Sequence, residues 1–174
     1  VRVTDNFTEP ITWTPLNNGY LTTQVYAISI GSGDQILAGF QDNGTWFTNS
    51  TSSTVNWDDP FSGDGAYSDF SNDGTVRFLS AQNAVIYRTT YSDANDPTPN
   101  NFSQVSIAGY NSELFITPLY LDRDNDEILY VGGDNALYVN STAKTGSVSS
   151  GWKAISLPGA SGVVSEMGLF GEGD

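Results

Sequence analysis

The stretch GFQDNGTWFT at residues 39–48 decides the fold, because it holds two strand-like runs around a short polar turn. Similar patterns return as SAQNAVIYRT at 80–89 and GGDNALYVNS at 132–141, with Asn43, Asn83 and Asn135 at the turns. Apolar, β-branched and aromatic runs favour strands, and an Asn-Gly or Asn-Ala turn between them is typical of a hairpin, since Asn and Gly tolerate positive φ. The asparagines lie 40 and 52 residues apart, a spacing typical of β-propeller blades.

Each hairpin belongs to a longer unit in which we expect four strands. The first strands are expected at residues 25–30, 66–70 and 114–119. The hairpin strands are expected at 35–40 and 45–47, at 75–80 and 85–87, and at 127–132 and 137–139. The fourth strands are expected to start near Trp57, Phe102 and Trp152. Small residues such as Gly39 and Gly132 recur late in the second strands, where neighbouring blades of a propeller crowd together.

The sequence therefore predicts an all-β fold, a β-propeller of four-stranded antiparallel blades that is incomplete in this chain. Residues 23–60, 64–108 and 112–158 form the three expected blades. Residues 11–22 are interpreted as the end of a preceding blade, and residues 162–174 as the start of the next one. Because propellers close with about 4–8 blades, we expect the rest of a larger chain or partner subunits to complete the ring.

Composition narrows the function classes. Twenty Asp and Glu against six Lys and Arg give a formal charge of −14, which repels phosphate backbones and argues against a nucleic-acid partner. The chain has no histidine and no cysteine, which excludes Ser-His-Asp catalysis, histidine metal sites and disulfides within it. No apolar run approaches the roughly 20 residues of a membrane span, so no membrane insertion is expected. Many Asn, Ser, Thr and Gly with few Lys are typical of an extracellular or cell-surface protein.

A resemblance to a known family rests on the runs LNNGYLTTQVYAI, GFQDNGTWF, SGDGAYSDF, AQNAVIYR and FITPLYLDRDNDEILYVGGDNALYVNS, followed by GWKAISLP. Together, over roughly residues 11–170, they resemble the Asp-box (BNR) propellers of the sialidase-like and sortilin/VPS10-like kind, found in large secreted or cell-surface proteins of the Bacteroidetes type. The Asp-box itself, Ser-x-Asp-x-Gly-x-Thr-Trp, is not intact; only its frame leads to Trp57 and Trp152. The resemblance implies a propeller in an extracellular setting and little about chemistry.

Several residues are candidates for ligand contacts because they combine aromatic rings or polar groups with expected loops. The binding candidates are Gln41, Asp42, Trp57, Asp64 and Tyr67, together with Asn17, Asn18 and Tyr20 in the N-terminal loop. A glycosidase would need two carboxyl groups at a defined separation. Acidic candidates are Asp42, Asp58, Asp59, Asp64, Asp69 and Asp134. Sialidases use three arginines, whereas here only Arg77 and Arg88 are expected to face each other, across one hairpin, so no triad is evident.

The segment Asp122-Arg123-Asp124-Asn125-Asp126-Glu127 is the candidate metal site. Asp122, Asp124 and Asp126 place carboxylates at alternating positions of a short loop, which suits calcium, an ion that takes six to eight oxygen ligands. The loop lacks the glycine and the distant glutamate of an EF-hand. The alternative is a solvated polar turn between two strands. Calcium is the one cofactor candidate.

The function that these features favour is an extracellular, non-catalytic propeller scaffold for protein or glycan binding, in adhesion or surface assembly. One alternative is a fragment of a xyloglucanase-like or sialidase-like glycoside hydrolase. Another is a structural subunit of a surface polymer, completed by neighbouring chains across its open edges. A close pair of carboxylates in a cleft with aromatic walls would favour the hydrolase.

Overall fold

A computed structural model describes residues 2–4, 10–15, 23–52, 55–112, 114–159 and 161–168 of the chain. Over these residues the secondary structure consists of strands, and no helix there is long and apolar enough to cross a membrane. Sheet I contains β3 (Val25–Ile30), β4 (Ile36–Phe40), β5 (Gly44–Thr48) and β6 (Asp58–Phe61). Sheet II contains β7 (Gly65–Phe70), β8 (Val76–Ala81), β9 (Val85–Thr90) and β10 (Asn101–Gln104). Sheet III contains β11 (Leu119–Leu121), β12 (Leu129–Gly132), β13 (Ala136–Asn140) and β14 (Trp152–Ser156).

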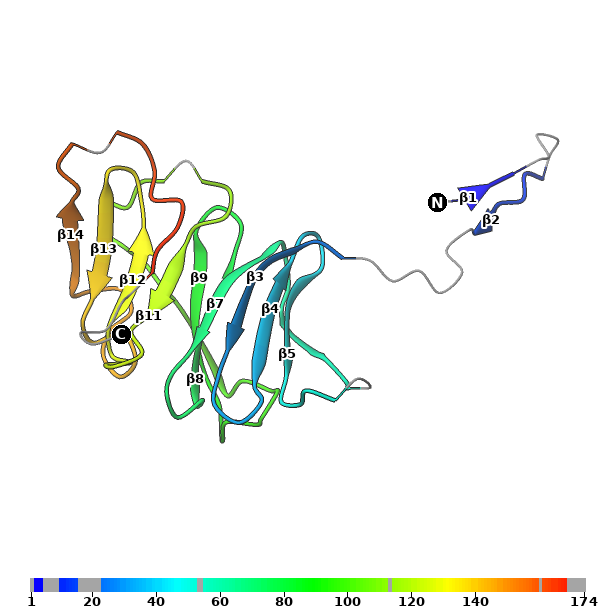
Figure 1. Ribbon diagram of the computed structural model, residues 1–174, viewed down its shortest axis with the longest axis horizontal. Helices are drawn as coiled ribbons and strands as arrows, with labels where there is room; N and C mark the ends of the chain where they lie inside the picture. Colours follow the sequence, from blue (N-terminus) through cyan, green and yellow to red (C-terminus); the bar gives the residue numbers. More distant parts are fainter. Residues whose placement is uncertain are drawn as a thin grey trace.

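The three sheets are antiparallel meanders in chain order, and they lie next to one another in a propeller-like arrangement (Figure 1). The first strand of each sheet lies on the inner side: β7 packs against β3 and β4, and β11 packs against β7. This arrangement confirms the all-β prediction and the three predicted hairpins. A further small sheet pairs β1 (Arg2–Val3) with β2 (Thr14–Pro15).

Two apolar clusters hold neighbouring sheets together. Leu37 and Phe47 of sheet I pack against Phe70 and Leu79 of sheet II. The larger cluster joins sheets II and III through Phe78, Ile86, Leu119, Leu121, Leu129, Val131 and Tyr138, among others. Alternating residues of each strand therefore face the preceding and the following sheet, so both faces of the middle sheet are buried.

The crowding predicted for the small residues is present between sheets I and II and beside sheet III. A Cβ on Gly39 would come within 2.2 Å of the Ala66 carbonyl oxygen, and one on Gly132 within 2.9 Å of the Val164 carbonyl oxygen. Both glycines lie where the first strand-like segment of the next unit crosses the sheet. A side chain at either position would push that segment away.

The structure corrects three details of the sequence interpretation. The first strand of the third unit, expected at 114–119, is β11 at Leu119–Leu121, because Pro118 has no N–H to donate to a strand ladder. Asn43 does not carry the positive φ of the first turn; Asp42 (φ 59°) and Gly44 (φ 74°) do.

The third correction concerns the two arginines of sheet II. Arg77 pairs with Thr89 and Arg88 pairs with Phe78, so the arginines lie on opposite faces of the sheet. They do not face each other, because a shift of one residue in register moves a side chain to the other face.

The structure describes only part of the two terminal segments that the sequence assigns to neighbouring blades. In the range 11–22, β2 pairs with β1, while residues 16–22 lie outside the described residues, and so do the binding candidates Asn17, Asn18 and Tyr20. In the range 162–174, Val163 forms a bridge with Asp134, and the Val164 N–H donates to the Gly133 carbonyl at 3.0 Å. Residues 169–174 also lie outside the described residues.

Candidate functional site

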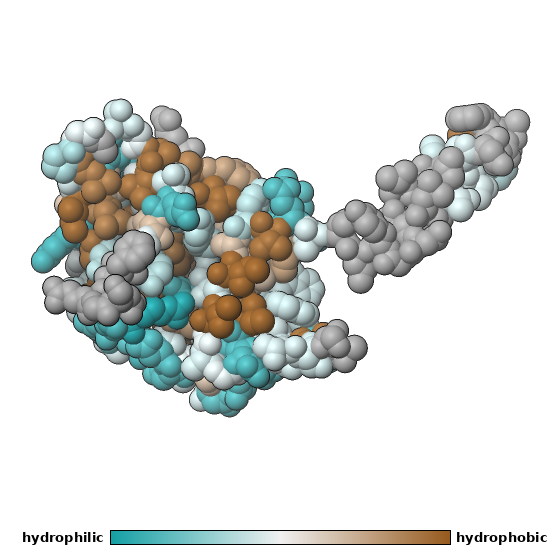
Figure 2. Space-filling model, in the orientation of Figure 1, coloured by the Kyte–Doolittle hydropathy of each residue, from teal (hydrophilic) through white to brown (hydrophobic). Residues whose placement is uncertain are grey.

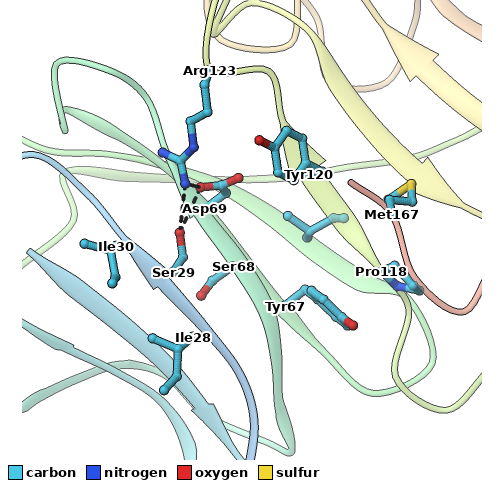
Figure 3. A pocket seen from close by; sticks show the side chains of 11 residues that line it. Ile28, Ser29, Ile30, Tyr67, Ser68, Asp69, Pro118, Tyr120, Arg123 and Met167 are labelled. Carbon is cyan, nitrogen blue, oxygen red and sulfur yellow. Dashed lines mark hydrogen bonds and ion pairs between the residues drawn. The ribbon is translucent and has the colours of Figure 1, made fainter. Parts of the chain in front are cut away.

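A pocket of about 510 Å³ lies against the inner strands of all three sheets, and we call it the inner pocket. Its wall consists of Ile28, Ser29 and Ile30 from β3, Tyr67, Ser68 and Asp69 from β7, Pro118, Leu119 and Tyr120 at β11, and Arg123 and Met167. Figure 3 shows these side chains converging from separate strands. The pocket lies where the first strands of the three sheets, β3, β7 and β11, come together.

Asp69 is the one carboxylate among these wall residues, and its residue is only 4% exposed. Its Oδ1 atom accepts hydrogen bonds from the Ser29 hydroxyl at 2.8 Å, the Phe70 N–H at 2.9 Å and Arg123 Nη2 at 2.6 Å. Its Oδ2 atom accepts from the Leu121 N–H at 3.0 Å. One carboxylate therefore joins sheets I, II and III, and a buried charge of this kind is retained only with such partners.

Two further groups give the inner pocket its chemical character. The Ser68 hydroxyl is buried and has no hydrogen-bond partner within the described structure, although the residue lines the pocket. Burial, and after it the negative charge of Glu166, raises the pKa of the Tyr67 phenol above its ordinary value, so this hydroxyl stays protonated. The wall thus offers hydroxyl groups and a guanidinium among apolar side chains.

A second, shallower pocket of about 320 Å³ lies at the outer part of sheet I, and we call it the Trp pocket. It is lined by Trp46 and Trp57 with Phe40, Asn43 and Thr23. Trp57 is 39% exposed, and the indole N–H of Trp46 donates to the Asn43 carbonyl. An exposed indole beside a second ring and an amide side chain is suited to stacking against an apolar face while hydrogen bonding at its rim.

The structure brings some of the predicted binding residues together and separates others. The Asp42 N–H donates to Asp64 Oδ1 at 2.8 Å, so these two lie side by side with Gln41 at the hairpin turn of sheet I. Trp57 lies in the Trp pocket, whereas Tyr67 lies in the inner pocket. The five residues therefore belong to three places rather than to one site.

Two carboxylates of the predicted calcium loop, those of Asp122 and Asp126, are engaged within the protein. Asp122 Oδ1 accepts from the N–H groups of Asp124 and Asn125, as in a capped polar turn. Asp126 Oδ2 accepts from Lys144 Nζ at 2.8 Å and from the Asn72 N–H at 2.7 Å. Over the described ranges no group of three metal-binding side chains is spaced to hold an ion. Calcium binding by Asp122, Asp124 and Asp126 stays a prediction, and the contacts match the alternative of a polar turn.

Four of the six basic residues join neighbouring sheets. Arg77 is fully buried, with its guanidinium carbon 3.8 Å from the centre of the Phe47 ring of sheet I. Arg88 extends to the opposite side, where Nη1 donates to the carbonyls of Ala143, Lys144 and Gly146 in the loop between β13 and β14 of sheet III. Arg123 binds Asp69, and Lys144 binds Asp126 and Asp73. These four basic side chains therefore link neighbouring sheets. The planar guanidinium of arginine suits this role because its five donors have a fixed geometry.

The Lys144 contacts shift the protonation equilibria of two groups. Burial alone would raise the pKa of Asp73, but hydrogen bonds from Ser71, Lys144 and Thr75 outweigh it and hold this pKa well below its ordinary value. Burial would lower the pKa of Lys144, but Asp126 and Asp73 outweigh that effect and raise it. Both groups are charged at neutral pH, and their pairing links sheet II to sheet III.

Sequence reasoning did not single out Ser68 or recognise Arg123 as the partner of Asp69. The one available signal was a carboxylate inside an otherwise strand-like run, GAYSDF, since a charge in a buried strand requires partners. Which partners it has could not be read from the sequence, because Arg123 lies 54 residues away.

Comparisons with known proteins support the fold and nothing finer. No family model matches the chain, and no curated protein matches it. Among solved structures it is similar to the holo form of the PQQ domain of pyranose dehydrogenase from Coprinopsis cinerea, with a TM-score of 0.59 and 11% identity. The match covers 76% of this chain and 38% of the other. The chain is therefore an all-β protein with a propeller-like arrangement of four-stranded sheets.

Proposed function

We propose that this chain is part of an extracellular or cell-surface β-propeller of the Asp-box-like kind, a non-catalytic scaffold that binds a glycan or a protein. The observation that carries the proposal is the Trp pocket, where Trp57 is exposed beside Trp46 and the Asn43 side chain. Aromatic platforms on rigid sheets bind apolar sugar faces with little loss of conformational entropy. A neutral glycan is the ligand that this geometry favours.

The state of the carboxylates supports binding rather than hydrolysis. The hydrolase alternative needs one acid and one base facing a common cleft. Asp69, the carboxylate in the wall of the larger pocket, is buried and accepts four hydrogen bonds. Asp64 accepts from the Asp42 N–H and lies at a turn. These carboxylates hold the fold together, which is the role expected in a scaffold.

Completion of the ring by further sheets, from a longer chain or from partner subunits, is part of this proposal. Corresponding residues can be matched because, in each first turn, the N–H of Gly31, Ser71 or Asp122 donates to a carbonyl at the start of the next strand segment, of Gln35, Val76 or Ile128. One residue earlier, Phe70 and Leu121 are 1% and 0% exposed under the preceding sheet, whereas Ile30 in sheet I is 66% exposed. Figure 2 shows the apolar surface over β3 that results. A preceding sheet would cover it as sheet I covers sheet II.

The glycan-binding proposal is tested with the 174-residue chain and cellohexaose, a neutral β-linked glucan, by isothermal titration calorimetry. We expect saturable binding, weakened at least tenfold in Trp57→Ala, because an aromatic anchor at a binding site contributes more than about 1.4 kcal/mol. The matched control is Phe102→Ala, which removes a similarly exposed ring from β10 of sheet II. Equal binding by Trp57→Ala and the wild type, or release of shorter sugars during the titration, would contradict the proposal.

A further inference from the structure

The inner pocket combines an oriented guanidinium, a buried hydroxyl without a partner and an apolar wall, and the scaffold role does not use these groups together. We propose that the inner pocket is a second ligand site, which binds a short neutral saccharide carrying an acetamido group. This inference rests on the proposed glycan-binding function, and it assigns a different site and a narrower ligand class. Its volume of about 510 Å³ lies within the range of small-molecule sites.

The free N–H donors of Arg123 favour a ligand that accepts hydrogen bonds. Its Nη2 atom is held by Asp69 Oδ1 at 2.6 Å and lies 3.4 Å from the Ser29 hydroxyl, while the side chain remains 41% exposed. A guanidinium has five N–H donors and no acceptor, so the donors beyond this ion pair require oxygen atoms from a ligand or from water. Figure 3 shows Arg123 extending from its loop toward Asp69 and Ser29 on one side of the pocket.

The charges around the pocket favour a neutral ligand. The Arg123 cation is already balanced by Asp69, and Glu166 lies close enough to Tyr67 to raise the pKa of its phenol, after the larger effect of burial. The chain as a whole carries a formal charge of −14. A carboxylate ligand would therefore meet no uncompensated positive charge, whereas an amide carbonyl accepts hydrogen bonds without adding a negative one.

The hydroxyl groups of the wall match those of a sugar. The Ser68 Oγ atom is buried without a partner, in a residue that is 7% exposed. A buried polar group in this state is costly, and a ligand that reaches it restores the missing hydrogen bond. Tyr67 and Tyr120 also line the pocket with phenol rings, which combine an apolar face with a hydroxyl.

The remaining wall is apolar and suits the methyl group of an acetamide. Ile28, Ile30, Pro118 and Met167 surround the polar groups. If a further sheet covered sheet I, Ile30 would leave the wall, because its counterparts Phe70 and Leu121 are buried and do not line the pocket, whereas Ile28 would stay in it. Ser68 and Leu119, which correspond to Ile28 in the other two sheets, are covered by their neighbours and still line the pocket.

The test uses the 174-residue chain and three small saccharides in calorimetric titrations: the disaccharides N,N′-diacetylchitobiose and cellobiose, and the trisaccharide 3′-sialyllactose. We expect N,N′-diacetylchitobiose to bind at least tenfold more tightly than cellobiose, which lacks the acetamido groups, and than the anionic sialyllactose. Ser68→Ala should weaken this binding at least threefold while raising the melting temperature or leaving it unchanged, since it removes an unsatisfied hydroxyl. A purely structural serine would not show that combination.

Variants at the two sites separate this inference from the proposed function. Loss of N,N′-diacetylchitobiose binding in Trp57→Ala with full binding in Ser68→Ala would overturn the inner-pocket assignment and leave the Trp pocket as the glycan site. Tighter binding of sialyllactose than of N,N′-diacetylchitobiose would overturn the neutral-ligand argument. Absence of binding by all three probes and by cellohexaose would overturn both proposals.

Discussion

Replacement of Asp69 by alanine should reveal how unequally the two partners of one ion pair stabilise the fold. The substitution leaves the buried N–H groups of Phe70 and Leu121 and the Ser29 hydroxyl without an acceptor. Each unsatisfied buried group costs about 1–3 kcal/mol, and some of this cost is relieved when water enters the space. We expect Asp69→Ala to lower the free energy of unfolding by about 3–5 kcal/mol, a large part of a typical 5–15 kcal/mol. Arg123→Ala should cost only about 0–1 kcal/mol, because this half-exposed guanidinium pairs in a well-screened environment.

Equilibrium unfolding in urea, followed by tryptophan fluorescence, measures both variants against the wild type. Asp124→Ala, which removes an exposed carboxylate from a nearby loop, is the control and should change the free energy by no more than about 0.5 kcal/mol. Equal losses for Asp69→Ala and Arg123→Ala would refute the reasoning. That result would mean that the salt bridge, rather than the hydrogen bonds to buried backbone groups, provides the stabilisation.

Three further positions give predictions that the same unfolding assay can check. Because the pKa of Asp73 is lowered in the folded chain, the stability it provides is present above its unfolded pKa of about 3.9 and is lost as the pH falls toward its folded pKa. Unfolding measured between pH 2 and pH 6 should therefore show a shallower acid loss in Asp73→Asn than in the wild type, and identical profiles would contradict the lowered pKa of Asp73. Gly39→Ala should destabilise the chain by at least about 1 kcal/mol, since its Cβ would lie 2.2 Å from the Ala66 carbonyl oxygen; a neutral effect would show that the contact is loose. Ala84→Gly should stabilise it by up to about 1 kcal/mol, because Ala84 has a φ of 58° that glycine adopts without strain, and a loss of stability would refute this.

The local elements could be read from the sequence because they depend on neighbouring residues. Alternation of apolar and polar side chains, with Asn or Gly between the runs, predicts a hairpin wherever it occurs. The structure places strands at 44–48, 85–90 and 136–140, next to the predicted turns. The error at residues 114–119 has a local cause as well: the apolar pattern favoured a strand, but Pro118 delays its start.

The sites were less accessible to sequence reasoning because they depend on which faces and sheets meet. Trp57 and Tyr67 are ten positions apart and belong to different pockets, since the chain passes from the outer edge of sheet I to the inner strand of sheet II between them. Asp122 and Asp126 looked like metal ligands because their spacing suits an ion. Lys144, whose ammonium group binds the Asp126 carboxylate, comes from another loop, so a local sequence pattern cannot reveal this pairing.

The sequence by itself determined the all-β class, the repeat of four strands, the hairpin turns and the strongly acidic character of the chain. These properties follow from composition and from interactions between residues close in the chain. The tertiary structure alone decided that Asp69 joins three sheets, that Arg77 and Arg88 point to opposite neighbours, and that Ser68 remains unsatisfied in the wall of the inner pocket. The physical reason is that strand register selects the face of each side chain, and the packing of sheets distant in sequence then selects its partners.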